Sequence, residues 1–256
     1  MRRLIEFPCA GQMLVGTLDE GPSTTGLLVV SGGNEVRMGA HRGMALLAAR
    51  LAATGTPVFR FDRRGVGDSS GENAGFLSSA PDIAAAAATF SAETGLRRLV
   101  AFGNCDAATA LALFRHVAGI DALVLANPWV IEETDDLPPA AAIRARYAER
   151  LRDPATWLRL LKGGVDLRKF IKGLSKLSQS RSEPDDGLAT QVIAALEGQS
   201  DVTIVLAKSD ATAIAFADAT HGKLDATVEI IDTASHSFAR EEDQAALEQV
   251  LRAALA

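Results

Sequence analysis

The chain has 256 residues, 48% of them apolar and 23% charged, a composition typical of globular proteins. Its formal net charge of −6 argues against nucleic-acid binding. The two cysteines, Cys9 and Cys105, are too few for a disulfide framework, and no apolar run is long enough to span a bilayer. Because the first residues lack a secretory pattern, we expect a reduced, cytoplasmic protein.

The first half of the chain alternates between strand-like and helix-like patterns. Predicted strands, each a short apolar run bounded by turn residues, cover residues 2–7, 13–18, 26–33, 56–62, 98–103 and 121–128. Predicted helices cover residues 39–55, 82–95 and 105–119. Such repetition predicts an α/β fold with a mainly parallel sheet and helices on both faces.

The alternation stops after Pro128 and resumes near residue 200. Between them, about 128–200, the pattern is helical, which predicts a helical lid inserted into a single domain over residues 1–256. Afterwards, strands are expected over residues 201–207 and 226–231, and helices over 211–220 and 240–256.

The stretch from Gly103 to Ala107 joins a predicted buried strand to a predicted helix. This is the setting of a nucleophile elbow, which needs small residues two positions before and after the nucleophile, here Cys105. The start of a helix also favours an anion such as a thiolate. Cys105 is therefore either a nucleophile or a small buried apolar residue.

An acid and a histidine follow this elbow in the order that such a nucleophile needs. Asp210 comes just after the strand over 201–207, and His236 after the next strand. Both loops belong to the carboxyl edge of a parallel sheet, which also carries the elbow. The sequence thus predicts a triad of Cys105, His236 and Asp210. Weaker candidates for the histidine and the acid are His116, His221, Asp218 and Asp232.

An oxyanion hole would take one N–H from the residue after the nucleophile, Asp106, and one from the glycine-rich loop after the third strand. Gly33 or Asn34 would supply the second, unless these residues form only a turn. The Asp106 carboxylate suits a helix N-terminus but opposes a neighbouring thiolate, and a protonated His236 would offset it.

Basic residues follow the same loop. Arg37, His41 and Arg42 either bind an anionic part of a substrate or anchor the next helix. In the later loop "FDRRGVGDSSG" we expect a structural network of arginine and aspartate that fixes the loop near the site. Its members would be Asp62, Arg63 and Asp68.

That loop resembles the DxRGxGxS loop of α/β-hydrolases related to serine aminopeptidases and lysophospholipases. Most of the chain is similar to the hydrolases associated with the exosortase A system, a bacterial family that accompanies exopolysaccharide and protein-sorting loci. The segments that carry this similarity are "SGGNEVRMGAHRG", "GNCDAATA", "RDPATWLRLLKGGVDL" and "TASHSF". The resemblance implies hydrolase chemistry, with the family's cysteine at Cys105 and its histidine at His236. The family often has glycine where Ala107 stands.

The predicted lid carries eleven Lys or Arg residues against three Asp or Glu between Ile143 and Arg181. This is either a solvated helix face or a docking surface for an acidic carrier protein, coenzyme-A phosphates or an anionic membrane. Trp157 would line an acyl pocket or pack the lid onto the core, and Trp129 is a further candidate for substrate contact.

The predicted function is hydrolysis of an ester or thioester with a small-molecule acyl group, through an acyl intermediate on Cys105. The alternatives are an acyltransferase on the same scaffold and a binding protein without catalysis. The cysteines and histidines show no ligand spacing, so neither a metal nor a cofactor is expected.

Overall fold

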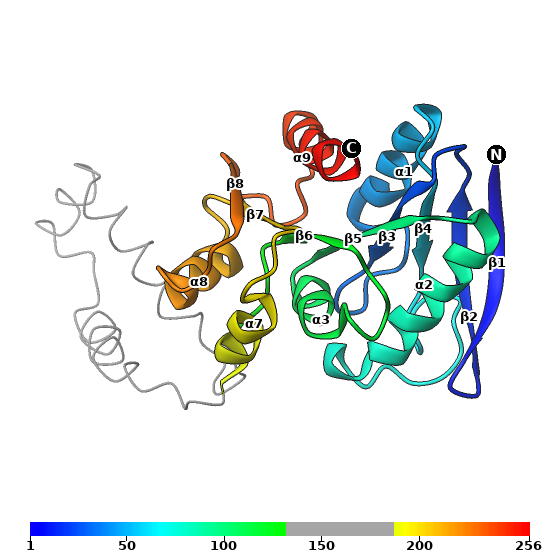
Figure 1. The fold of residues 1–256 in the computed structure, drawn as a ribbon, viewed down its shortest axis with the longest axis horizontal. Helices are drawn as coiled ribbons and strands as arrows, with labels where there is room; N and C mark the ends of the chain where they lie inside the picture. Colours follow the sequence, from blue (N-terminus) through cyan, green and yellow to red (C-terminus); the bar gives the residue numbers. More distant parts are fainter. Residues whose placement is uncertain (132–186) are drawn as a thin grey trace, which may run out of the picture.

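The computed structural model describes residues 1–131 and 187–256. In these ranges, eight strands form one sheet with the order β1-β2-β4-β3-β5-β6-β7-β8 (Figure 1). The pairs β1–β2 and β2–β4 are antiparallel, and the other neighbours are parallel. The strands are β1 (Arg2–Cys9), β2 (Gln12–Asp19), β3 (Thr25–Val30), β4 (Val58–Phe61), β5 (Arg98–Asn104), β6 (Ala122–Ala126), β7 (Val202–Ala207) and β8 (Thr227–Ile231).

Helices cover both faces of this sheet (Figure 1). Helices α1 and α9 pack on one face, and α2, α3, α7 and α8 on the other, each over its own apolar core. Successive side chains of the central strands point alternately into the two cores. In β5, Ala101 points to one core, and Val100 and Phe102 point to the other. The helices are α1 (Gly43–Ala53), α2 (Ala80–Thr94), α3 (Asp106–Phe114), α7 (Leu188–Leu196), α8 (Ala211–Thr220) and α9 (Glu241–Leu255).

The predicted fold class is confirmed, but two helices are shorter than predicted. The helix expected over 39–55 begins only at Gly43, because His41 and Arg42 have φ of 52° and 61°, in the left-handed region that interrupts an α-helix. The helix expected over 105–119 ends at Phe114.

Most of the predicted lid lies outside the described residues, and with it the basic segment 143–181 and Trp157. Helix α7 is the described end of that insertion and is helical, as expected. Within residues 1–131 and 187–256, no helix has both the length and the apolar character to cross a membrane.

A buried arginine in β4 connects the sheet to the loop after β3. Arg60, with a side chain 2% exposed, donates to the Asp19 carboxylate at 2.9 Å and to the carbonyl of Arg37 at 2.8 Å. Burial lowers the pKa of Arg60, and the hydrogen bond to Asp19 opposes that shift. The Arg60–Asp19 pair therefore fixes the β3–α1 loop to the sheet.

We expect Asp19→Asn to lower the free energy of unfolding by about 3–5 kcal/mol, because it leaves the Arg60 charge buried without its counter-ion. Urea unfolding measures this. The matched control is Asp232→Asn, which breaks only an exposed pair with Lys208 and should cost a small fraction of that amount. Equal losses in the two variants would contradict the role given to Arg60.

Candidate active site

The chain turns sharply at Cys105, between β5 and α3. Cys105 has φ 61° and ψ −127°, and it caps the N-terminus of α3. Its N–H donates to the carbonyl of Ala126 at 2.9 Å, and its carbonyl accepts from the N–H of Trp129 at 3.2 Å. These contacts with the β6 end hold a conformation that few residues with a side chain adopt.

The two small residues that flank Cys105 at two positions' distance, Gly103 and Ala107, are small for different reasons. A Cβ at Gly103 would lie 2.8 Å from the carbonyl carbon of Ala107, so only glycine fits there. Ala107 is fully buried, and its methyl group is accommodated in the core under α3. The turn thus has the geometry of a nucleophile elbow with alanine in the last small position.

His236 and Asp210 come together at the same sheet edge. Nδ1 of His236 lies 2.7 Å from Oδ1 and 3.0 Å from Oδ2 of Asp210. Asp210, with a side chain 6% exposed, also caps α8 by accepting from the N–H of Thr212. His236 is 42% exposed on its side chain, so one end of the ring is anchored and the other faces the cavity described below.

The hydrogen bond to Asp210 raises the pKa of His236, and its interaction with the Cys105 side chain raises it further, to about 10, although burial opposes both. The imidazole is therefore held in its protonated form at neutral pH, next to the sulfur. This brings together the three side chains that the sequence predicts as a triad, in the order nucleophile, base and orienting acid.

Two asparagines hold the backbone of His236. Asn104 donates to the His236 carbonyl at 3.0 Å, and Asn127 donates to it at 3.2 Å. Asn127, fully buried, also donates to Asn104 and accepts from the N–H of Ala207. Sequence reasoning missed both, although each lies at or just after the end of a parallel strand, where site residues gather.

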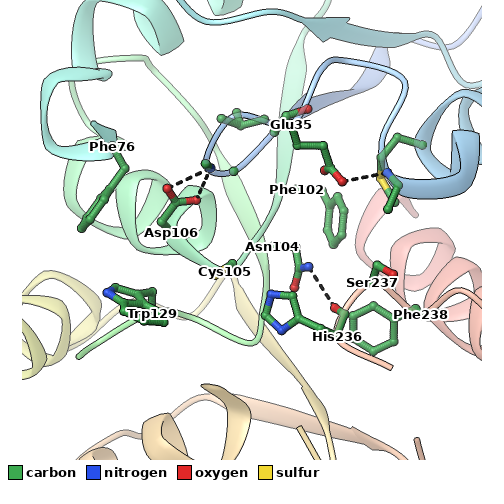
Figure 2. A pocket seen from close by; sticks show the side chains of 16 residues that line it. Glu35, Phe76, Phe102, Asn104, Cys105, Asp106, Trp129, His236, Ser237 and Phe238 are labelled. Carbon is green, nitrogen blue, oxygen red and sulfur yellow. Dashed lines mark hydrogen bonds between the residues drawn. The ribbon is translucent and has the colours of Figure 1, made fainter. Parts of the chain in front are cut away.

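A cavity of about 420 Å³ lies over Cys105 and His236. Figure 2 shows its labelled residues around one open space. Much of its wall is apolar, as an acyl group requires. The apolar lining includes Val30, Met44, Phe76, Phe102, Trp129 and Phe238. Trp129, a sequence-predicted candidate for substrate contact, is thus among the lining residues.

A second carboxylate in the cavity was not predicted. Glu35 lines the cavity and accepts from the N–H of Ala40 at 2.7 Å. Desolvation raises the pKa of Glu35, while the charge of His236 opposes this shift. Its place in the glycine-rich loop was the only signal in the sequence.

Of the predicted oxyanion donors, Gly33 and Asp106 line the cavity, and the N–H of Gly33 already has a hydrogen-bond partner. Asp106 is the first residue of α3, so its N–H has no acceptor within the helix. The Gly33 N–H donates to both carboxylate oxygens of Asp106, each at 2.9 Å. Asn34 accepts from the side chain of Asn73 and is not among the residues found lining the cavity.

The three basic residues that follow the glycine-rich loop are not part of the described cavity lining. Arg37 forms an ion pair with Asp62 and another with Asp68 at 2.8 Å. His41 and Arg42 are exposed, and the described cavity lining includes none of these three basic residues. An arginine–aspartate network is present, but its cation is Arg37 rather than the predicted Arg63, which instead donates to the Gly33 carbonyl and lies near Asp106.

Among residues 1–131 and 187–256, no three His, Cys, Asp or Glu side chains are grouped to hold a metal ion. Cys9, the second cysteine, is the buried last residue of β1, where burial and a hydrogen bond to Asp82 raise its pKa to about 11.

Comparison with known proteins gives a family and a fold. The model of the alpha/beta hydrolase family matches residues 27–250. No curated protein matches the sequence.

Solved structures resemble the chain over nearly its whole length. The esterase PF2001 of Pyrococcus furiosus is 16% identical with a TM-score of 0.64, covering 100% of this chain and 91% of that one. The alpha/beta hydrolase GrgF from Penicillium sp. sh18 is 15% identical with a TM-score of 0.66, covering 99% and 98%. The thioesterase domain from the curacin biosynthetic pathway is 16% identical with a TM-score of 0.61, covering 98% and 99%. At these identities, the likeness shows the fold.

We expect Gly103→Ala to destabilise the protein by about 1–3 kcal/mol, because the added methyl group overlaps backbone atoms of α3. Urea unfolding tests this. Gly43→Ala is the control: position 43 has helical φ and no atom within 4 Å of an added Cβ, so it should not lose stability. A neutral Gly103→Ala would show that the elbow relaxes easily.

The raised pKa of His236 also predicts a pH dependence of stability. A pKa raised on folding stabilises the protein fully below about pH 6.5, and this contribution is lost as the pH rises towards 10. In Asp210→Asn the pKa of His236, measured by NMR titration, should fall, and the decline of unfolding free energy between pH 6.5 and 10 should flatten. Asp232→Asn should keep the wild-type profile.

Proposed function

Because this chain belongs to the alpha/beta hydrolase family, we propose that it hydrolyses an ester or a thioester through an acyl intermediate on Cys105. The observation that carries the proposal is the elbow cysteine beside a histidine whose other nitrogen is held by a buried aspartate. A thiol that served only packing would need neither partner.

In the proposed reaction, His236 already holds the proton of the Cys105 thiol, and the Cys105 sulfur attacks the carbonyl carbon of the substrate. The N–H groups of Asp106 and Gly33 stabilise the oxyanion. As the tetrahedral intermediate collapses, the bond to the leaving group breaks, and that alkoxide or thiolate receives the proton from His236. His236 then deprotonates a water molecule, which attacks the acyl-cysteine and releases the acid and the thiol.

The nucleophile and the cavity favour activated acyl groups. Thiolates react readily with thioesters, lactones and activated esters, whereas amides have a poorer leaving group. The apolar wall suits a hydrocarbon chain. Two structural neighbours are an esterase and a thioesterase domain, which supports this choice, as does the resemblance to exosortase-associated hydrolases with a cysteine at the elbow.

The first test is the reactivity of the two thiols. At neutral pH, iodoacetamide should alkylate Cys105 at least about tenfold faster than Cys9, because Cys105 lines the open cavity beside the His236 cation, whereas burial holds Cys9 as a thiol. Peptide mass spectrometry assigns the label. The rate at Cys105 should drop in His236→Ala and stay at the wild-type value in His221→Ala. A slow Cys105, indifferent to His236→Ala, would contradict the proposal.

The second test traps the intermediate. Incubation with p-nitrophenyl acetate, a longer p-nitrophenyl ester and an acyl-coenzyme A, followed by intact-mass measurement, should add one acyl group that maps to Cys105. Cys105→Ala should show no adduct. If no acyl donor modifies Cys105 while iodoacetamide does, a binding role on the same fold replaces the hydrolase proposal.

A further inference from the structure

The Asp106 carboxylate occupies a donor that the proposed chemistry needs. Both of its oxygens accept from the N–H of Gly33 at 2.9 Å, and this N–H is the second donor predicted for the oxyanion hole. An anion from the protein itself is thus bound where the oxyanion of a substrate would be stabilised. Figure 2 shows the carboxylate directed at the loop rather than into the open cavity.

The residues around the Asp106 carboxylate form a closely fitting site, called the seat below. A Cβ at Gly32 would lie 2.3 Å from Oδ1 of Asp106, so the absence of a side chain at position 32 lets the carboxylate approach. Asp106 is 18% exposed on its side chain, which is well below the exposure of a solvated surface acid.

Arg63 offers the carboxylate a second place to bind. Its side chain is 4% exposed, donates to the Gly33 carbonyl at 2.6 Å, and has Nη2 4.0 Å from Oδ2 of Asp106. Nη1 of Arg63 is buried and, in the described part of the chain, has no hydrogen-bond partner. A carboxylate hydrogen bond to arginine is shorter by about 1 Å, so a small rotation of Asp106 would exchange Gly33 for Arg63.

We propose that Asp106 is a gate on the oxyanion hole: its carboxylate covers the Gly33 N–H in the resting protein and turns towards Arg63 when a substrate carbonyl binds. The inference rests on the proposed function and adds to it a residue that controls access to the oxyanion hole. Because a hydrogen bond to a charged group is worth roughly a tenfold or greater factor in an equilibrium constant, the competition slows acylation by a similar factor.

The test compares two reactions of the same thiol. Acylation by p-nitrophenyl acetate, followed by the burst of p-nitrophenolate, passes through an oxyanion. Alkylation by iodoacetamide does not, so it reports thiolate reactivity alone. The ratio of the two rate constants isolates the oxyanion hole. We expect this ratio to rise about tenfold in Asp106→Ala and by a smaller factor in Asp106→Asn, whose amide oxygen is a weaker acceptor of the same shape.

Glu35→Gln serves as the comparison for charge, because it removes the other cavity carboxylate without freeing Gly33. The gate predicts a larger rise in the ratio for Asp106→Ala than for Glu35→Gln. Asp106→Asn preserves the shape of the seat and decides the matter if the alanine variant fails to fold.

A ratio that stays constant or falls in both Asp106 variants, with a burst in the wild type, overturns the gate and assigns the carboxylate to holding the loop. A burst that is absent from every variant and the wild type, with normal alkylation of Cys105, contradicts the hydrolase function itself. The two failures are therefore distinguishable.

Discussion

At Cys105 the backbone has φ 61° and ψ −127°, a conformation that costs a residue with a side chain on the order of 1–3 kcal/mol. The end of β6 stabilises it through the Ala126 carbonyl and the Trp129 N–H. Because the chain reverses within one residue, the sulfur and the N–H of Asp106, which has no acceptor within α3, come to the same point at the start of that helix. The arrangement of the other site residues around the sulfur therefore depends on this turn.

His236 is positioned near Cys105 by contacts with the ends of the sheet strands, and not by its own loop alone. Asn127 connects three strand ends, since it accepts from β7, donates to Asn104 of β5 and donates to the His236 carbonyl. A buried amide with all these partners is costly to misplace, because each lost partner leaves a buried polar group unpaired. The spacing between sulfur and imidazole is therefore set by the register of β5, β6 and β7.

The sequence was sufficient to predict what depends on local pattern. Short apolar runs followed by glycine predict buried parallel strands, and their order places Cys105, Asp210 and His236 on one edge. It was insufficient for contacts made through space. The left-handed turn at His41 interrupts an amphipathic pattern that reads as helix, and the orientation of Arg37 depends on Asp62 and Asp68, which lie on a different loop.

The same limit applies to Asp106. From the sequence, its carboxylate opposes the neighbouring thiolate, and only position 236 offers compensation. In the structure, the two carboxylate oxygens share the single N–H of Gly33, and Oδ2 lies 4.0 Å from the buried guanidinium of Arg63. A charge bound by a donor and facing a cation acts on the sulfur as part of a nearly neutral group. The elbow therefore tolerates an acid next to its nucleophile, and the arrangement that makes this acid harmless is also the one that covers the oxyanion donor.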